Sequence, residues 1–480
     1  MPNMNIKKIG LILGPLLCLI VGLLPTPEDM QFSAKIVGAI ALWMAIWWIS
    51  EAVPFPVTAL IPLGLFPVFQ IMPVSSVTTA YSHHIIFLFL SGFIFALCIE
   101  RWQLHKRLAL NAINQFGFQF NRILLGFMIA SAFLSMWVSN TATTLMMIPI
   151  ATAVASQLDP KNTATNYQVF SISLLLGIAY SASIGGAATL IGTPPNAIMA
   201  GMLEKQAGIT ISFFDWMLFA LPLATVFLII TWFYLSYKIS ASKLENQIGS
   251  KEIIQQQLSK LAPMSYEEKC VSVIFFCVCL SWILRGFINW EWLSTIKDAT
   301  IGIIGAIILF VVPAKNKNTR LMDWETTKKL PWGILILFGG GFALASGFEQ
   351  TELTTWMATK FTLLEGTSLY IIIFSIVFFV IFLTEITSNT ATATLLIPIM
   401  IALSSSLNQS PLLLSIAVAV ATSYAFMLPV ATPPNAIVFA SGRVPIQKMA
   451  KTGFWLNIIG SGLITFFVLS LIPIIFPQFN

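Results

Sequence analysis

The sequence AFLSMWVSNTATTLMMIPIATAV at residues 132–154 returns as IFLTEITSNTATATLLIPIMIAL at residues 381–403, 249 positions later. A second motif follows each copy, because TPPNAI occurs at 193–198 and again at 432–437. Each half of the chain thus carries the same two motifs in the same order. An internal repeat of this kind decides the architecture, and the rest of the sequence is interpreted around it.

The composition around these motifs is that of a membrane protein. Of 480 residues, 57% are hydrophobic and only 9% are charged, and the mean hydropathy is +0.87. These values exclude an ordinary soluble globular chain. The net charge of +6 does not indicate nucleic-acid binding, since the basic residues are dispersed and form no patch with aromatic residues.

Apolar stretches long enough for helices recur along the whole chain. A spanning helix needs about 20 mainly apolar residues, and the pattern predicts an all-α polytopic protein with about eleven transmembrane helices. We expect them near 9–25, 35–51, 55–72, 83–101, 170–203 (broken), 214–237, 270–289, 299–313, 332–350, 412–441 (broken) and 453–477.

The repeat divides the chain into four parts. We expect an N-terminal transmembrane helix (1–30), a first repeat (31–240), a cytoplasmic linker (241–268) and a second repeat (269–480). Each repeat would hold one re-entrant hairpin, at 122–157 and 370–406, and one broken helix, at 170–203 and 412–441. An odd number of crossings separates equivalent positions, so the two repeats enter the membrane from opposite sides. Inverted repeats with discontinuous helices are typical of secondary transporters.

The distribution of Lys and Arg predicts the orientation. With the N-terminus in the cytoplasm, 20 of the 25 basic residues fall on the cytoplasmic side. Only Lys35, Lys205, Arg285, Lys297 and Lys360 then lie outside. Positive charge concentrates on cytoplasmic loops, so this threading is favoured, with the C-terminus in the periplasm.

The Ser-Asn-Thr triplets are the candidate tips of the two hairpins. Each flanking arm has about 16 apolar residues, roughly 24 Å of helix, which is short for a hydrocarbon core of about 30 Å. Hydroxyl and amide groups at such a tip, with the N-terminus of the following helix, could hold a carboxylate or Na⁺. The alternative is that Ser and Thr simply pack helices or bond their own backbone.

The Thr-Pro-Pro-Asn motifs predict helix breaks, because proline has no N–H and cannot continue a helix. Pro194 and Pro195 would free the carbonyls of Leu190 and Ile191 as cation ligands. The first copy is preceded by Gly185, Gly186 and Gly192, which permit close backbone approach, and the second is not. We therefore expect two unequal ion sites.

Few charged residues accompany these motifs. Glu385 precedes the second tip where the first copy has Met136, and it could be an ion ligand, a proton carrier or a hairpin residue facing water. The motifs contain no Lys or Arg, so a negative substrate would depend on neutral donors and bound cations. The chain is not expected to be an enzyme, since its only histidines, His83, His84 and His105, lie near membrane edges and no Asp pair occurs in the apolar segments.

Both tips, the stretch ATLIGTPPNAI at 188–198 and the sequence ERWQLHKR at 100–107 resemble the divalent anion/sodium symporter family over nearly the whole chain. The resemblance implies an elevator-type homodimer in the bacterial inner membrane that needs no cofactor and uses Na⁺ as the coupling ion. It implies sodium-coupled symport of C4-dicarboxylates such as succinate, malate and fumarate. Sodium-independent di- or tricarboxylate exchange and sulfate transport remain open.

The resemblance also implies the binding residues. The first sodium site would use Ser135, Ser139, Asn140 and Gly192; the second would use Thr384, Thr387, Ser388, Asn389 and Ala431. The substrate would be held by Ser139, Asn140, Thr141, Thr193, Ser388, Asn389, Thr390 and Thr432.

Overall fold

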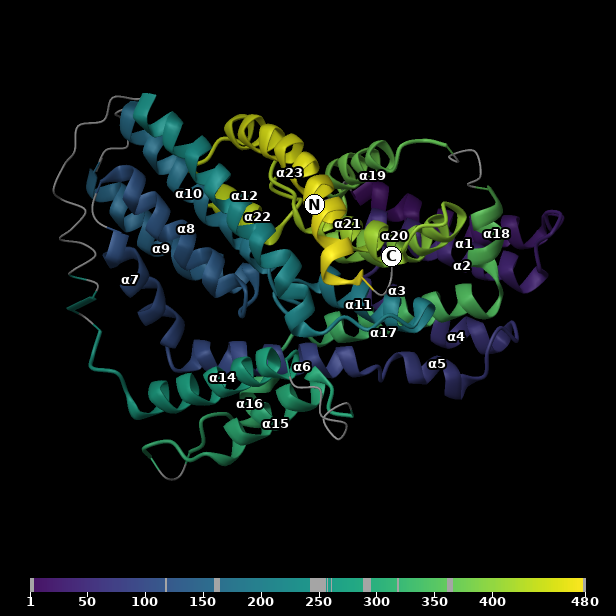
Figure 1. Cartoon of the computed structure of the whole chain (residues 1–480), viewed down its shortest axis with the longest axis horizontal. Coiled ribbons are helices and arrows are strands. Elements are labelled where there is room, and N and C mark those ends of the chain that lie inside the picture. Colours follow the sequence, from purple (N-terminus) through teal and green to yellow (C-terminus); the bar gives the residue numbers. More distant parts are fainter. Residues whose placement is uncertain are drawn as a thin grey trace.

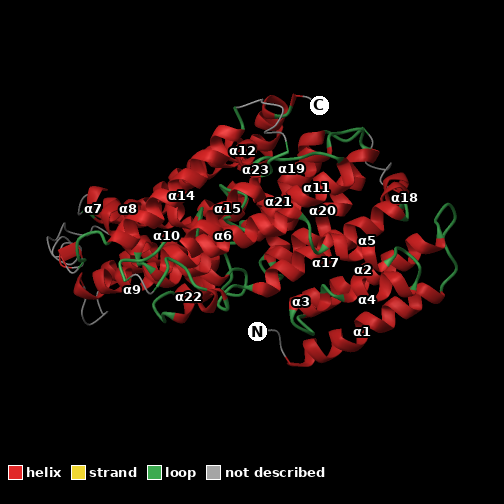
Figure 2. Ribbon diagram, turned by 90° about the horizontal axis from the view of Figure 1, so that it is seen from below, coloured by secondary structure: helices red, strands yellow, loops and turns green. Residues whose placement is uncertain are grey.

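A computed structural model gives the arrangement of the chain. It describes residues 4–116, 119–158, 165–241, 256, 258–259, 261–287, 295–316, 319–360 and 366–477. Within these ranges the chain is helical, and no strand is drawn in Figure 2. The predicted all-α fold is thus confirmed.

The helices of the first half begin with α1 and end with the long α12. They are α1 (Met4–Leu23), α2 (Phe32–Ser50), α3 (Phe55–Thr58), α4 (Ile61–Val68), α5 (Val74–Ala80), α6 (His84–Arg101), α7 (Leu104–Phe116), α8 (Phe120–Ser135), α9 (Asn140–Leu158), α10 (Thr165–Gly186), α11 (Pro194–Ala207) and α12 (Phe213–Ala241).

The second half begins with α14 to α16, and from α17 onward it repeats the order that starts at α6 in the first half. Its helices are α14 (Tyr266–Arg285), α15 (Asp298–Val311), α16 (Trp324–Thr327), α17 (Trp332–Gln350), α18 (Leu353–Lys360), α19 (Leu369–Thr384), α20 (Asn389–Ser406), α21 (Pro411–Ser423), α22 (Pro433–Ala440) and α23 (Ile446–Ile475).

The sequence repeat is also a repeat of elements. The hairpin of α8 and α9 turns over residues 136–139, and the hairpin of α19 and α20 turns over 385–388. Each hairpin is followed by a helix that stops, an irregular segment, and a short helix that begins on proline. Pro194 and Pro433 each occupy a first helical position, where the missing N–H costs nothing.

The broken helices lie at the centre of the molecule. Every residue of α21 from Leu412 to Ser423 is buried, and α10 is the most buried of the long apolar helices, whereas α1 is the least. A helix that is apolar all round belongs in such a position. The centre is therefore built from the two elements that the proline motifs interrupt.

The two halves exchange partners at this centre. Helix α9 of the first hairpin packs against α22, and α20 of the second hairpin packs against α11. Likewise α10 contacts α22 and α11 contacts α21. Each hairpin thus supports the short helix of the other half.

The remaining helices form the outer part of the molecule. Figure 1 shows α1, α2 and α18 at one end, α7 to α9 at the other, and α14 to α16 with α6 along the lower edge. Helix α17 joins this part to the centre, because it packs against α2 to α6 and also against α11 and α20.

Eight described helices are long and apolar enough to cross a membrane, and five apolar helices are shorter. The expected crossing at 55–72 is one of these shorter segments, Phe55–Val68, and a turn at residues 59–60 divides it into α3 and α4. Pro62 has no N–H for the carbonyl of Thr58, so the helical hydrogen bonding is weakened at that point.

The expected linker extends from 241 to 268, but its last three residues already belong to a helix. Helix α14 begins at Tyr266, where Ser265 and Glu268 form a capping box in which each side chain bonds the other's backbone N–H. Residues 242–255, 257 and 260 of the expected linker lie outside the described residues.

Candidate functional site

The first hairpin tip brings a hydroxyl and an amide together. The Ser135 hydroxyl, at the end of α8, donates to Oδ1 of Asn140, the first residue of α9. Ser135 is buried, while Asn140 and Thr141 are half-buried. Ser139 is exposed, and its Oγ accepts the Ala142 amide at 3.3 Å, which caps α9.

The second tip repeats this pair. The Thr384 hydroxyl donates to Oδ1 of Asn389 at 2.7 Å and also reaches the carbonyl oxygen of Thr422 at 3.2 Å. Ser388, Asn389 and Thr390 are half-buried. In both copies the hydroxyl stands five positions before the asparagine, so two neutral oxygens meet at each tip. The contact with Thr422 also brings the second tip to the end of α21.

Thr387 is placed differently from the other predicted ligands. Its hydroxyl donates to the carbonyl oxygen of Leu383 at 2.9 Å and lies 2.7 Å from the Thr392 hydroxyl. Both partners belong to its own hairpin. The structure therefore does not bring the Thr387 hydroxyl to Asn389.

The glycines of the first broken helix make room for the tip. A Cβ atom on Gly186 would overlap the side-chain amide of Asn140, and one on Gly192 would overlap the carbonyl oxygen of Gly186. A Cβ on Gly185 would overlap the backbone of Ala132 in α8. The predicted close approach at these glycines is confirmed, and it gathers Ser135, Asn140 and Gly192 into one region.

Two asparagines hold the irregular segments in shape. Nδ2 of Asn196 donates to the carbonyls of Ala187 at 3.1 Å and Thr189 at 2.8 Å. These carbonyls lie between the end of α10 and the start of α11. Buried carbonyls need such partners.

Asn435 does the same in the second copy. Its Nδ2 donates to the carbonyls of Ala425 and Leu428, each at 3.1 Å. Both asparagines are fully buried. Sequence reasoning missed this role, although the asparagine follows Pro-Pro in both motifs and that repetition was a usable signal.

Thr193 and Thr432 precede the short helices in extended conformation, and both are buried. The Thr432 hydroxyl accepts the Asn435 amide at 3.3 Å and caps α22. Thr193 makes no such capping bond. Thr193 and Thr432 therefore lie at two helix N-termini, where backbone N–H groups and the helix dipole favour an anion.

A different tie joins the hairpin tip to the broken helix in each half. In the first half, the Thr189 hydroxyl donates to the carbonyl oxygen of Met136 at 2.6 Å and accepts the Gly192 amide at 3.0 Å. In the second half, Glu385 stands at the position of Met136. There it is the Glu385 side chain, and not a backbone carbonyl, that joins the tip to the broken helix.

The Glu385 carboxylate receives four hydrogen bonds. Oε1 accepts from the amides of Phe426 at 2.7 Å and Met427 at 2.8 Å and from Nδ2 of Asn457 at 2.8 Å. Oε2 accepts from the Leu428 amide at 2.9 Å. Because Glu385 is only 2% exposed, the interpretation that it faces water is wrong. It fastens the second tip to the irregular segment that leads to Ala431.

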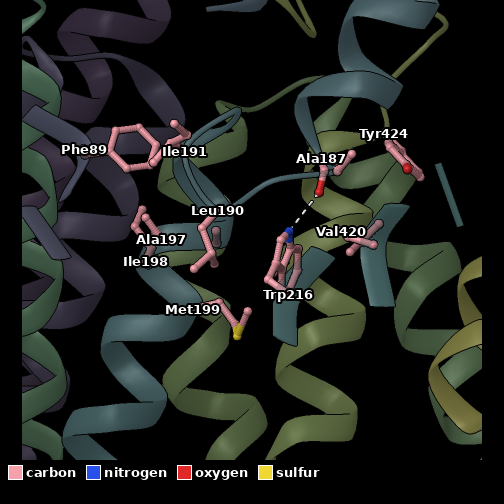
Figure 3. Packing of buried hydrophobic residues seen from close by; sticks show 14 of the residues in the cluster. Phe89, Ala187, Leu190, Ile191, Ala197, Ile198, Met199, Trp216, Val420 and Tyr424 are labelled. Atoms are coloured by element: carbon pink, nitrogen blue, oxygen red, sulfur yellow. Dashed lines mark hydrogen bonds between the residues drawn. The ribbon is translucent and has the colours of Figure 1, made fainter. Parts of the chain in front are cut away.

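Aromatic residues enclose these segments. Figure 3 shows the Trp216 indole pointing at the carbonyl of Ala187, to which it donates at 3.0 Å. The ring of Phe227, on α12, lies 5.1 Å from the ring of Tyr424 and 5.6 Å from that of Phe426. Residues of the first half thus pack directly on the broken helix of the second.

A cavity of about 340 Å³ lies beside the first hairpin tip. Ala96 and Glu100 of α6, His105 of α7, and residues of both hairpin arms line it. None of the eight predicted substrate residues is among those that line it. The cavity therefore adjoins the first hairpin tip without being lined by the predicted substrate residues.

Comparison with known proteins agrees with this architecture. A family model described as the sodium:sulfate symporter transmembrane region matches residues 6–476. A protein of Staphylococcus saprophyticus named sodium-dependent dicarboxylate transporter SdcS is 46% identical over 475 residues, covering 97% of this chain and 92% of its own. The protein of the same name from Staphylococcus aureus strain MSSA476 is 48% identical, covering 98% and 92%.

Two solved structures share the fold at low sequence identity. The YdaH transporter of Alcanivorax borkumensis aligns with a TM-score of 0.56 at 13% identity, over 84% of this chain and 88% of its own. MtrF of Neisseria gonorrhoeae, from a class of antimetabolite efflux pumps, aligns with a TM-score of 0.60 at 12% identity, over 98% and 96%.

Proposed function

The chain belongs to the family of the sodium:sulfate symporter transmembrane region, and on that premise we propose that it carries C4-dicarboxylates such as succinate, malate and fumarate into the cell together with sodium ions. The relatives named sodium-dependent dicarboxylate transporter support both the cargo and the coupling ion. The protein acts as a multi-span membrane transporter and not as an enzyme.

One observation carries the proposal: the same hydroxyl and amide oxygens meet at both hairpin tips. Ser135 pairs with Asn140, and Thr384 pairs with Asn389. Neutral oxygens beside irregular backbone are the ligands that transporters offer to Na⁺. Since residues 135–141 and 384–390 contain no Lys or Arg, co-bound cations supply the positive charge that a dicarboxylate requires.

The residues inferred from the family resemblance take these roles in the proposal. Ser135, Ser139, Asn140 and Gly192 bind one sodium ion, and Thr384, Thr387, Ser388, Asn389 and Ala431 bind the other. Thr387 must turn from its contacts with Leu383 and Thr392 to take part. The substrate lies between the ions, against Ser139, Asn140, Thr141, Thr193, Ser388, Asn389, Thr390 and Thr432.

The packing supports an elevator-type motion. Helices α8 to α12 and α19 to α23 contact one another across the two halves and would move as one body. Helices α2 to α6 and α14 to α17 would stay fixed, with α17 at the boundary between the two bodies. We further propose that two copies associate through the fixed body in the inner membrane, with N-termini in the cytoplasm.

Uptake of labelled succinate into proteoliposomes tests the function. Under an inward sodium gradient we expect accumulation, and with potassium or choline in place of sodium we expect none. Asn140→Ala and Asn389→Ala should each reduce sodium-driven uptake at least tenfold, because each removes a paired oxygen of one ion site. Both variants should still elute from a size-exclusion column at the same volume as the parent protein.

The alternatives give different results in the same assay. An anion exchanger would need dicarboxylate inside the vesicle and ignore sodium. A sulfate carrier would accumulate labelled sulfate, and sulfate would then displace succinate. Normal uptake by both asparagine variants would remove the proposed ion sites.

A further inference from the structure

A cluster of two histidines and one glutamate lies away from the hairpin tips. His83 and His84 stand at the start of α6, and Glu204 lies in the last turn of α11. A nitrogen from each ring and a carboxylate oxygen all lie within 4.8 Å of one another. Among the described residues this is the one group of three or more such side chains with metal-binding spacing.

The two rings are neighbours in sequence and yet face the same carboxylate. His83 is extended at the N-cap while His84 is already helical, so the rings stack with centroids 4.6 Å apart at 28°. Nε2 of His84 lies 2.7 Å from Oε2 of Glu204, and Nε2 of His83 lies 3.9 Å from the same oxygen. The backbone at this helix start therefore points both imidazoles at one acceptor.

The His83 ring packs against Phe342, with centroids 4.9 Å apart, and its nitrogen atoms remain available. Its Nδ1 is buried and has no hydrogen-bond partner, and the 3.9 Å separation of its Nε2 from Glu204 is too long for a hydrogen bond. Turning toward a bound ion would therefore cost the ring no hydrogen bond, only part of its ring contacts with His84 and Phe342.

We propose that His83, His84 and Glu204 form a binding site for a divalent transition-metal ion, best suited to Zn²⁺. Two imidazoles and one carboxylate are a known protein ligand set for zinc, with a fourth position left for water. The side chains of His84 and Glu204 are 34% and 21% exposed, so an ion can reach them. The three donor atoms already lie within 4.8 Å of one another, so side-chain rotations would have to bring them to the 2.0–2.2 Å bonds that zinc requires.

Lys297 competes with the metal for the same carboxylate. Its ammonium lies 3.3 Å from the other oxygen of Glu204, and its side chain is 40% exposed. The ammonium can move into water when an ion of higher charge binds. Lys297 lies on the segment before α15, so three separate elements meet at Glu204.

The position gives metal binding a consequence, which rests on the proposed transport function. Helix α11 begins beside Thr193 of the candidate site and ends near Glu204. If α11 moves relative to α6 in each cycle, an ion held by both helices stops the movement. Zinc should therefore inhibit uptake in proportion to its occupancy of this site.

Calorimetric titration of purified protein with ZnCl₂ tests the site directly, without a sodium gradient or substrate. We expect one ion per chain. His84→Ala and Glu204→Gln should each weaken binding at least about tenfold. Lys297→Met should strengthen it about three- to tenfold by removing a nearby positive charge.

His105→Ala is the matched control, since His105 is the remaining histidine and contacts the carbonyl of Ile99 instead. It should bind zinc as the parent does. Absence of binding, or equal binding by His84→Ala, overturns the site. Binding that leaves sodium-driven uptake unchanged overturns only the inhibition. Failure of uptake in the parent protein counts against the transport function and leaves the titration valid.

Discussion

At the scale of single residues, the proposed ion sites rest on the pairing of an amide with a hydroxyl five positions earlier. Asn140 is paired with Ser135 and Asn389 with Thr384. The sequence points to the two asparagines because both copies keep the Ser-Asn-Thr triplet, whereas Ser135 and Thr384 are implied only by the family resemblance. It could not predict that Thr387 turns away to Thr392, since that choice depends on how one side chain packs within its hairpin.

Gly186→Ala should impair sodium binding with little loss of stability. The added Cβ would overlap the end of the Asn140 side chain, which can rotate away but would then leave Ser135. We expect the sodium concentration for half-maximal uptake to rise about tenfold or more, with the melting temperature nearly unchanged. Sodium titration of succinate uptake measures the first quantity, and a thermal-unfolding assay measures the second.

Gly462→Ala serves as the control, because no atom lies within 4 Å of the Cβ that it would add. Alanine in a helix is about 0.5–1 kcal/mol more favourable than glycine, so this variant should transport normally. Equal sodium dependence in the two variants would contradict the contact between Gly186 and Asn140.

At the scale of elements, the positions of the broken helices could be predicted from sequence, but the contacts that stabilise their irregular segments could not. Prolines predict that a helix ends, and the motifs lie where α11 and α22 begin. The side chains that hold the irregular segment between the two parts of a broken helix come from distant parts of the chain. Asn457 on α23 reaches Glu385, 72 positions away, and no local pattern indicates that contact.

Glu385→Ala should destabilise the second broken helix. The amides of Phe426, Met427 and Leu428 would lose their acceptor, and an unpaired buried donor costs about 1–3 kcal/mol. We expect the unfolding free energy to fall by roughly 3 kcal/mol or more, and the sodium requirement for uptake to rise. Glu385→Gln keeps an acceptor and should lose less.

Thermal unfolding with and without sodium checks this expectation. Glu325→Ala is the control, because Glu325 is exposed and pairs only with nearby Lys328, which is worth little. If Glu385→Ala kept both parental stability and parental sodium dependence, the fastening role would have to be abandoned.

At the scale of the whole molecule, the repeated order of elements could be predicted because hydrophobic length and the two motifs recur. The division of 55–72 into α3 and α4 could not, since its apolar composition hides the effect of Pro62. The packing of each hairpin on the opposite half is likewise invisible in sequence. The membrane orientation still rests on the distribution of charge.

Cysteine labelling tests that orientation. In a variant whose five cysteines, all free in the structure, are replaced by serine, Lys360→Cys should react with a membrane-impermeant maleimide in intact cells. Arg320→Cys should react only after the cells are permeabilised. Both positions are exposed, so accessibility within the protein does not distinguish them. The reverse pattern would mean that the chain is threaded in the opposite direction.

The unequal ties between tip and broken helix have a kinetic consequence. A single neutral hydrogen bond from Thr189 joins the first pair, whereas a carboxylate with three backbone donors joins the second. Neutral bonds contribute about 0.5–1.5 kcal/mol and charged ones about 1.5–3 kcal/mol. The second half-site should thus be preformed in the empty protein, while the first assembles as its ion arrives. Loading of the carrier would then follow a fixed sequence, with the ion beside Asn389 arriving first.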